Sequence, residues 1–572
     1  INRYAAEKFY GENWEVQEGE SFSDHKLITF DIIPPLLTPR ATRNMKNFDW
    51  HRFRVSVDRE LEGVDSGSQI DFKTSELIRA ITKALDEQAP KRYQKLKREP
   101  RWWKLSLSKK RSMIGRLSKN KKRGPEQSRF LNTLKRDYKR EIFEAKEESW
   151  KKFCTSSKSA TELSRLVKTL TKAPVQTALI KDGQGVQPDT ALQSLRNLLN
   201  HHFPEHRDSG GDPVSPPPVP GDSDRGIFEL LTPNIVKNAL GSFAPNKAPG
   251  PDEFRPKTLN NLGPKALGLL TEIYRHSLEH AYIPKAFLHM KVVFIPKDKP
   301  DRSCPKSYRP ITLSSFLLKG LERIVQWYLQ ETVLKTPLVN QHAYTKNRSC
   351  DTALSEAINQ IESGLSAKEH VAIVSLDCSG AFDNLTFASS MRALDNFGVS
   401  PYIKNWYKQL LSGRQVDSEM FGEKLTVYPS RGSPQGGVLS PLVWNMAVDT
   451  LLSQFPASGP VKAIGYADDV LLIARGIDPP TIAMNLQRAI NTALSWANSS
   501  GLSYNPAKTE CCYFYPGRRR PIWPTLHMGG SDLTYTNTVK YLGVTIDQQL
   551  SWRDHIFEKC LKAKRLLNIA KR

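Results

Sequence analysis

Two stretches, VAIVSLDCSGAFDNL at residues 371–385 and IGYADDVLLIA at residues 464–474, decide the fold of this chain. Residues 371–376 are mostly apolar, which predicts a buried strand with Asp377 at its end. In the second stretch, Asp468 and Asp469 interrupt an apolar segment that is typical of a hairpin. Similar short apolar strands alternate with helical patterns from residue 227 onward, which indicates an α/β domain.

The acidic side chains of these two stretches predict a metal site. Two adjacent carboxylates that are partly buried repel each other, and a divalent cation removes that penalty. Oxygen ligands without histidine favour magnesium over zinc. Two such ions shared between the strands could activate a hydroxyl group and stabilise a leaving pyrophosphate. An ordinary turn with two aspartates between strands is the alternative interpretation of the pair.

Composition divides the remainder of the chain into segments. We predict five: residues 1–35, which end in a strand-like run; a basic helical connector at 36–206; a linker rich in Pro and Gly at 207–226; a globular part at 227–547 with its core at about 278–547; and a basic amphipathic helix at 548–572. Residues 91–140 hold 20 Lys and Arg residues against three acidic ones, a net charge of +17, with Trp and Phe residues interleaved. This window predicts contact with phosphates and unpaired bases, or else a solvated helical face.

The overall charge indicates the class of partner. The 572 residues carry a formal net charge of +24, which favours a polyanion such as nucleic acid. No apolar run is long enough to span a bilayer and no signal peptide is recognisable, so we expect no membrane partner. The seven cysteines include no CxxC pair, which makes a structural zinc site unexpected and indicates reduced, intracellular thiols.

A series of further motifs occurs in order around the two acidic stretches. They are KAPGPDEF at 247–254, VVFIPK at 292–297, SYRPITL at 307–313, RGSPQGGVLSP at 431–441, NPAKTE at 505–510 and YLGVTID at 541–547. Together with YADD at 466–469, this series resembles the reverse transcriptases. The resemblance implies a right-hand polymerase of α/β (α+β) class, with fingers, a ferredoxin-like palm and a truncated helical thumb.

The resemblance also implies roles for individual residues. Asp377, Asp468 and Asp469 match the catalytic residues that bind two Mg²⁺ ions (with Mn²⁺ as a substitute), together with the backbone carbonyl of Cys378. The residues that match nucleotide-binding positions are Lys297, Arg309, Phe382, Gln435 and Lys508. Among these, Phe382 matches an aromatic steric gate that excludes a ribonucleotide 2′-hydroxyl, with core packing as the alternative. Tyr541, Leu542 and Gly543 match the primer grip.

The N-terminal segment indicates a branch of that family. FSDHKLI at 22–28 resembles the last block of an exonuclease–endonuclease–phosphatase domain, with Asp24 and His25 as its active-site remnant, expected to be inactive. That nuclease precedes the polymerase in jockey-like and I-element-like non-LTR retrotransposons. The implied partners are an RNA template, a DNA primer or target site and deoxynucleoside triphosphates. The resemblance also implies target-primed synthesis in the nucleus, after ribonucleoprotein assembly in the cytoplasm. The oligomeric state stays open.

Two alternatives accompany this interpretation. One is a catalytically inactive relic that binds nucleic acid, and the other is a maturase of the group II intron type. The motif GPDEF also departs from the family pattern, because Glu253 stands where a glycine is frequent. We expect that difference to alter a turn and to matter little for catalysis.

Overall fold

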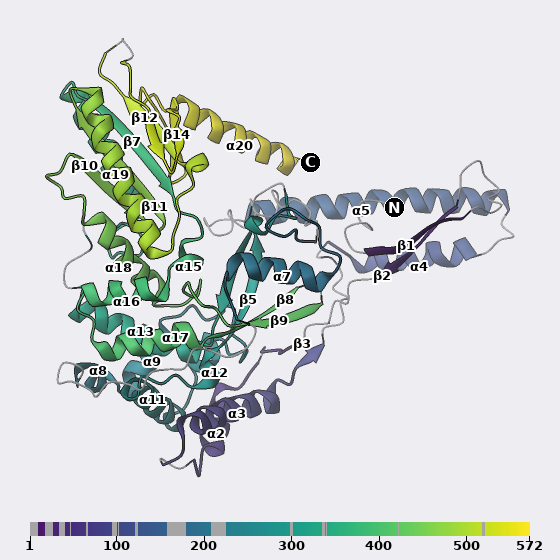
Figure 1. Cartoon of the computed structure of the whole chain (residues 1–572). Helices are drawn as coiled ribbons and strands as arrows, with labels where there is room; N and C mark the ends of the chain where they lie inside the picture. The colour runs from purple at the N-terminus through teal and green to yellow at the C-terminus, as the bar shows by residue number, and fades with distance from the viewer. Residues whose placement is uncertain are drawn as a thin grey trace. The chain divides into compact units, whose positions relative to one another are not determined.

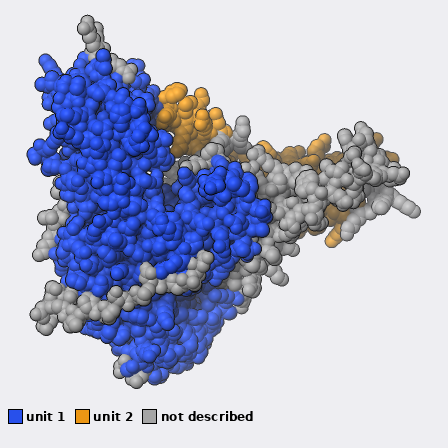
Figure 2. Space-filling view, in the orientation of Figure 1, with its two compact units in different colours: residues 1–38, 43–92, 176–555 blue, residues 39–42, 93–175, 556–572 orange. Residues whose placement is uncertain are grey.

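The computed structural model describes residues 10–17, 27–33, 41–45, 47–64, 67–93, 100, 102–119, 124–156, 179–207, 225–297, 301–334, 338, 340–420, 422–517 and 521–571. Two compact units are present (Figure 2): residues 1–38, 43–92 and 176–555 form the first, and residues 39–42, 93–175 and 556–572 form the second. Among the described helices, none combines the length and the apolar character that crossing a membrane requires.

A four-stranded antiparallel sheet in the order β10-β11-β7-β12 lies in the first unit. Its strands are β7 (His370–Asp377), β10 (Val461–Tyr466), β11 (Asp469–Gly476) and β12 (Glu510–Phe514). The buried side chains of β7 alternate between two apolar cores, with Ala372, Val374 and Leu376 in one and Val371 and Ile373 in the other. Because successive side chains of a strand point to opposite faces, both faces of this sheet are covered. Double burial explains why its strands are almost continuously apolar.

Helices cover the two faces of this sheet (Figure 1). The helix α14 (Cys350–Ser366) packs against β7, β10 and β11 on the side of Val371. The opposite side carries α16 (Phe387–Asn396), α18 (Ser440–Leu452) and α19 (Pro479–Ser500). Helix boundaries follow local capping chemistry: the Asp478 side chain accepts a hydrogen bond from the Thr481 N–H at the start of α19, and Gly501 ends that helix at φ 73°.

A second four-stranded sheet has the order β6-β5-β8-β9. It contains β5 (His289–Pro296), β6 (Tyr308–Leu313), β8 (Gln415–Met420) and β9 (Glu423–Val427), with the 3₁₀ helix η2 (Pro305–Ser307) before β6. The helix α7 (Ala191–His202) packs on this sheet, where Leu195 and Leu199 share an apolar core with Val292, Val416 and Val427. Three segments of the sequence, at 191–202, 289–313 and 415–427, therefore meet at this sheet.

A layer of helices completes the large core of the first unit. It comprises α2 (Trp50–Glu60), α3 (Ile70–Gln88), α8 (Arg225–Leu230), α9 (Pro233–Gly241), α10 (Pro256–Leu259), α11 (Pro264–Glu279), α12 (Lys285–Leu288), α13 (Phe316–Thr332) and α17 (Pro401–Gly413). Trp406 of α17 is fully buried and its indole N–H donates to the Ser277 hydroxyl at 3.1 Å. This bond satisfies a polar group that burial would otherwise leave without a partner.

Short strands flank these layers. Hairpins are formed by β1 (Tyr10–Gln17) with β2 (Leu27–Ile33), β13 (Leu526–Met528) with β14 (Ser531–Leu533), and β15 (Thr538–Tyr541) with β16 (Val544–Asp547). The remaining elements are β3 (Ala41–Thr42), β4 (Arg92–Tyr93), α15 (Ala381–Asn384), η3 (Pro506–Lys508) and α20 (Arg553–Lys571). The predicted strand-like run is present as β2, and the predicted C-terminal helix as α20. Asp24 and His25 lie outside the described residues.

The second unit contains the basic helices α4 (Leu105–Lys119) and α5 (Pro125–Ser156). They run antiparallel, since Lys104 at the start of α4 pairs with Glu148 near the end of α5 at 2.8 Å. The indole N–H of Trp103 donates to the Ser108 hydroxyl at 2.6 Å, and the Lys146 ammonium lies 5.0 Å from the centre of the Trp102 ring. Both Trp side chains of the basic window therefore take part in packing this helix pair.

The division into units differs from the predicted single connector at 36–206. Residues 43–92 and 176–206 belong to the first unit, because α3 and α7 bury apolar faces that include Leu77, Ile81 and Leu198. The predicted linker also begins one residue too early, since Arg207 exchanges two backbone hydrogen bonds with Tyr428. The basic composition of this region did not predict these amphipathic faces, because charged side chains on the solvent side of a helix give no information on the side that is buried.

Candidate active site

The predicted carboxylates meet at one end of the β10-β11-β7-β12 sheet. Asp377 is the last residue of β7 and Asp469 is the first residue of β11, and the antiparallel register places these two residues directly opposite each other. Asp468 lies in the tight turn between β10 and β11, where Ala467 has a left-handed φ of 55°. We call Asp377, Asp468 and Asp469 the carboxylate edge.

Neighbouring elements hold the turn that carries Asp468. The Ala467 N–H donates to the side-chain oxygen of Gln341 at 3.2 Å, and the Ala467 carbonyl accepts from the Trp444 indole N–H at 2.9 Å. Gln341 and Trp444 are both buried. A left-handed backbone is costly for a residue other than glycine, and these two bonds from buried groups maintain it.

Electrostatics at the carboxylate edge are unfavourable. Burial raises the pKa of Asp468 and the charge of Asp377 raises it further. Burial, Asp468 and Asp377 together raise the pKa of Asp469 to about 6. Burial, followed by the three carboxylates, also raises the pKa of the adjacent Cys378 thiol to about 12. The edge therefore concentrates negative charge, and this favours the binding of a cation.

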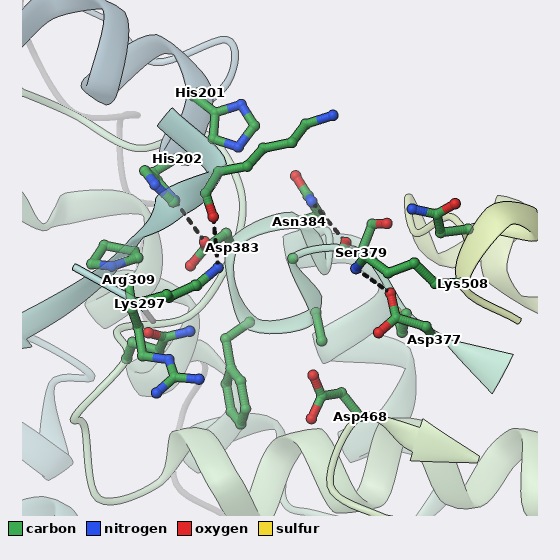
Figure 3. A pocket seen from close by; sticks show the side chains of 18 residues that line it. His201, His202, Lys297, Arg309, Asp377, Ser379, Asp383, Asn384, Asp468 and Lys508 are labelled. Carbon is green, nitrogen blue, oxygen red and sulfur yellow. Dashed lines mark hydrogen bonds and ion pairs between the residues drawn. The ribbon is translucent and has the colours of Figure 1, made fainter. Parts of the chain in front are cut away.

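Lys508 provides one cation. Its ammonium donates to the Asp377 carboxylate at 2.7 Å, from the 3₁₀ helix η3 that precedes β12 (Figure 3). Within the parts of the chain that the structure describes, no group of three or more His, Cys, Asp or Glu side chains is arranged to hold a metal ion. The chemistry of the donors nevertheless fits Mg²⁺, since the edge offers desolvated carboxylate oxygens that repel one another. A metal ion at Asp377 would replace the Lys508 ammonium there.

A cavity of about 310 Å³ opens beside the carboxylate edge (Figure 3). Most of the predicted site residues line it: Asp377, Cys378, Asp468, Lys297, Arg309, Phe382, Gln435 and Lys508. Lys306, His201, His202, Asp383, Asn384 and Asn505 are further lining residues. Arg309 of β6 and Lys297, the residue after β5, lie across the cavity from Asp377 (Figure 3).

Phe382 belongs to α15, the single helical turn that follows Asp377. Its ring centre is 5.4 Å from that of Trp444, and its backbone carbonyl accepts from the Ser433 N–H at 2.8 Å. The ring is partly buried and packs against the large core while also lining the cavity. The geometry therefore accommodates both predicted roles, a wall of the site and a contact with the core.

Close backbone packing positions the loop that carries Gln435. The Gln435 carbonyl accepts from the Thr312 N–H at 2.8 Å. Gly436 has φ 124°, and a Cβ atom at this position would lie 2.6 Å from the Thr312 carbonyl oxygen. Only glycine permits this contact. Gly432 is similar, because a Cβ atom there would lie 2.4 Å from the Asp383 carbonyl oxygen.

Two buried charged residues that the sequence did not single out support the same loop. The Glu322 carboxylate accepts from the Val438 and Leu439 N–H groups at 3.1 and 3.3 Å. The Arg414 guanidinium donates to the carbonyls of Leu411, Arg431 and Gly432 at 2.8–2.9 Å. Both side chains are almost completely buried. No sequence signal marks them, because their partners are backbone groups distant in the chain.

The predicted primer grip forms a hairpin turn. Tyr541 ends β15, and Leu542 and Gly543 follow with left-handed φ values of 46° and 82° before β16. Tyr541 is buried in the core on the α14 side of the sheet. The turn is not part of the cavity lining that the described residues form, so its predicted contact with a primer stays a prediction.

The structure gives a reason for a glycine at the position of Glu253. Glu253 has a left-handed φ of 62°, and its N–H donates to the Gly250 carbonyl at 3.0 Å. Glycine adopts this conformation without cost, and the expected change of the turn stays a prediction. Its carboxylate lies 2.5 Å from the Lys91 ammonium.

Comparisons with known proteins agree with this geometry. Residues 295–546 match the family described as reverse transcriptase (RNA-dependent DNA polymerase). A Pol polyprotein from the type-1 retrotransposable element R1 of Bradysia coprophila is 23% identical over 96% of this chain and 56% of its own length. The RNA-directed DNA polymerase from the mobile element jockey of Drosophila funebris is 23% identical over 94% of this chain and 61% of its own length. The chain thus spans somewhat more than half of these relatives.

A more distant likeness concerns a solved structure, the apo telomerase of Candida tropicalis truncated from the C-terminal domain. It is 13% identical, with a TM-score of 0.32 over 46% of this chain and 53% of that chain. We base no argument on it. The sequence relatives and the matched family, together with the mixed helix and strand content, are consistent with the right-hand polymerase fold that the motifs predict.

Proposed function

We propose that this chain is an RNA-directed DNA polymerase that extends a DNA primer on an RNA template. It carries a reverse transcriptase domain at residues 295–546 and is homologous over most of its length to polymerases of non-LTR retrotransposons. The observation that supports this best is the carboxylate edge itself. Asp377 and Asp468 line a cavity that also holds Lys297 and Arg309, and Asp469 lies directly opposite Asp377 in the sheet. This arrangement suits a nucleoside triphosphate. The basic side chains can bind its phosphates, and the carboxylates would hold the metal ions that act on the reacting phosphate.

Two Mg²⁺ ions, or Mn²⁺, would be held by Asp377, Asp468, Asp469 and the Cys378 carbonyl, and they would supply activation of the primer hydroxyl and stabilisation of the leaving pyrophosphate. The chain's own residues do the positioning. Arg309 and Lys297 bind phosphate oxygens, and an Arg guanidinium matches them with two parallel hydrogen bonds. The Gln435 loop, held at Thr312, orients the nucleotide against the template.

Lys508 has two roles in this proposal, one before a metal ion binds and one at the leaving pyrophosphate. Its ammonium pairs with Asp377 at 2.7 Å and is released when a stronger cation takes that carboxylate. It then lies near the phosphates and is available to donate a proton to the leaving pyrophosphate. Phe382 lies beneath the sugar and excludes a 2′-hydroxyl by steric overlap.

The wider biology is also a proposal. The element's RNA and a nicked DNA target are the partners we infer, with target-primed synthesis in the nucleus. The +17 window contributes phosphate contacts from α4 and α5. The nuclease remnant at Asp24 and His25 stays a prediction. The matched relatives do not favour an intron maturase, and the complete set of carboxylates argues against an inactive relic.

Primer extension tests the activity. The purified chain is incubated with a labelled DNA primer on an RNA template, the four deoxynucleoside triphosphates and MgCl₂. We expect extension that requires the template and stops with EDTA. Asp377→Asn and Asp468→Asn should abolish extension while primer–template binding, measured by fluorescence anisotropy, stays within about twofold of the unsubstituted chain, because neither carboxylate attracts phosphate. Full extension by Asp468→Asn would refute the proposal.

A further inference from the structure

His202, at the last turn of α7, contacts the residue next to Phe382. One imidazole nitrogen, Nδ1, lies 3.2 Å from the Asp383 carboxylate (Figure 3). The other, Nε2, lies 3.2 Å from the Pro305 carbonyl oxygen. The His202 side chain is 5% exposed and that of Asp383 is 13% exposed. An element about 180 residues before the carboxylate edge thus reaches the turn that carries the predicted steric gate.

Both neighbours of this imidazole are hydrogen-bond acceptors. A carbonyl oxygen cannot donate, so Nε2 must carry a proton toward Pro305. Contact of Nδ1 with a carboxylate then requires a second proton, held by the ring or shared with Asp383. With that proton on either partner, a hydrogen bond joins the His202 ring to the Asp383 carboxylate and so connects α7 to the α15 turn.

The α7 helix is itself held in place. Leu195, Leu198 and Leu199 are at most 1% exposed beneath the second sheet. The Asn197 side chain donates to the Ile180 carbonyl at 2.8 Å, and the Ser194 hydroxyl accepts from the Ile180 N–H at 2.7 Å. His202 therefore approaches Asp383 from a fixed support.

The α15 turn depends on its neighbours for support, because four residues are too few for a stable isolated helix. Ala381 and the Phe382 ring pack on the large core, and the Asn384 side chain donates to the Ser379 carbonyl. Besides these contacts and its bonds to Gly380, the turn is held by the Ser433 N–H at the Phe382 carbonyl and by His202 at the Asp383 side chain. Removal of the His202 contact leaves the Asp383 end of the turn without its side-chain anchor on α7.

We infer that His202 is a positioning residue for sugar selection: by holding Asp383 it fixes the α15 turn, and so keeps the Phe382 ring where it excludes a 2′-hydroxyl. This inference rests on the proposed polymerase function. A steric gate works only if its backbone cannot yield, because a shift of about 1 Å removes the overlap on which discrimination depends.

Two substitutions separate the contacts of the ring. The amide nitrogen of Asn stands where Nδ1 stands, so His202→Asn retains a donor to Asp383. The amide nitrogen of Gln stands near Nε2, so His202→Gln retains the donor to Pro305 and loses the one to Asp383. Asn200→Ala, at an exposed position of the same helix, is the matched control. Asp383→Ala removes the same contact from its other side.

The measurement is kcat and KM for one deoxynucleotide and the matching ribonucleotide on a DNA primer and RNA template, with a melting curve for each variant. For His202→Gln and Asp383→Ala, we expect the ratio of the two kcat/KM values to fall about tenfold or more, through a rise for the ribonucleotide. His202→Asn and Asn200→Ala should stay within about twofold of the unsubstituted ratio. The double variant His202→Gln with Asp383→Ala should show no further fall, because one contact is lost in all three.

The outcomes distinguish the two proposals. No extension by the unsubstituted chain overturns the polymerase function and the inference together. Extension with an unchanged ratio in His202→Gln and Asp383→Ala overturns the inference alone. A parallel loss of both kcat/KM values with a lower melting temperature also overturns it, because His202 is then only part of the structural support. If His202→Gln does not fold, Asp383→Ala decides by the same criteria.

Discussion

The carboxylate edge and the support of the Gln435 loop both gather charged side chains, and these side chains have opposite kinds of neighbours. At the edge, Asp377, Asp468 and Asp469 meet like charges, and Lys508 pairs with Asp377. Beneath the loop, Glu322 accepts from two backbone N–H groups and Arg414 donates to three carbonyls. The first region gathers carboxylates that repel one another, and the second holds charged groups that are hydrogen-bonded to the backbone, with the Glu322 Oε2 atom left without a partner among the described residues.

The difference teaches how the same residue types can be assigned. Buried charge that is hydrogen-bonded within the protein stabilises the structure around it, and its removal leaves polar groups without partners. Buried charge that repels its neighbours destabilises the fold and persists where function requires it. Substitutions in the two regions should therefore move stability in opposite directions, whatever they do to activity.

Asp468→Asn should have the largest effect on function. Loss of one ligand of a metal that stabilises several kcal/mol of transition-state charge should lower the extension rate by roughly 10³-fold or more. The melting temperature in EDTA should be equal or higher, because a neutral amide relieves the repulsion that raises the Asp468 pKa. Differential scanning calorimetry and single-turnover extension measure the two quantities. A clear fall in melting temperature would contradict the assignment of this carboxylate to the unsatisfied region.

Arg414→Met should have the largest effect on stability. It leaves three buried carbonyls without their donor, so we expect a loss of about 3–5 kcal/mol in the free energy of unfolding. Arg475→Met, which removes an exposed guanidinium 3.5 Å from Glu369, is the control and should cost under about 1 kcal/mol. Urea denaturation followed by tryptophan fluorescence gives both values. Equal losses would show that the Arg414 bonds add nothing beyond a surface ion pair.

Phe382→Val tests the residue that joins the two regions, since its ring lines the cavity and its carbonyl accepts from Ser433. The smaller side chain makes room for a 2′-hydroxyl, so preference for deoxynucleotides should fall about tenfold or more. Phe287→Val, in a fully buried part of the core, should lower the melting temperature and leave the preference intact. Steady-state incorporation of both nucleotide types decides. An unchanged preference for deoxynucleotides would show that Phe382 only packs against the core.

The smallest effect concerns pH. Asp469 has a pKa of about 6 in the fold against an ordinary value of 3.8, so the folded state binds its proton more tightly than the unfolded chain. Its contribution to stability is present below the ordinary value and is lost as pH rises through 6. In EDTA, Asp469→Asn should melt on the order of 2–4 °C above the unsubstituted chain at pH 7.5, with a smaller difference at pH 5.

MgCl₂ should reduce that difference at pH 7.5, since the cation offsets the same repulsion. Asp189→Asn, at an exposed position, is the control and should show no such dependence on pH or MgCl₂. A difference that is independent of pH, or that grows with MgCl₂, would contradict the electrostatic account of the edge.

Much of the site was predictable, because its motifs are local. The strand before Asp377, the turn at Asp468 and the glycines around Gln435 are each marked by a few consecutive residues, so composition and spacing reveal them. The segment boundaries were predicted less well. The apolar faces of α3 and α7 bury residues such as Leu77 and Leu195, yet their basic and polar surroundings led to the prediction of one connector.

By itself, the sequence determined the strands, the acidic residues and the family that their order resembles, since hydrophobic periodicity and motif spacing are properties of the chain. Tertiary structure alone decided which distant groups share a site. Nothing in the chain places His202 beside Asp383, Lys508 beside Asp377 or Arg414 beneath Gly432, because these contacts arise only when separate elements pack. The physical reason is that burial and hydrogen bonding act between neighbours in space, and separation along the chain does not limit them.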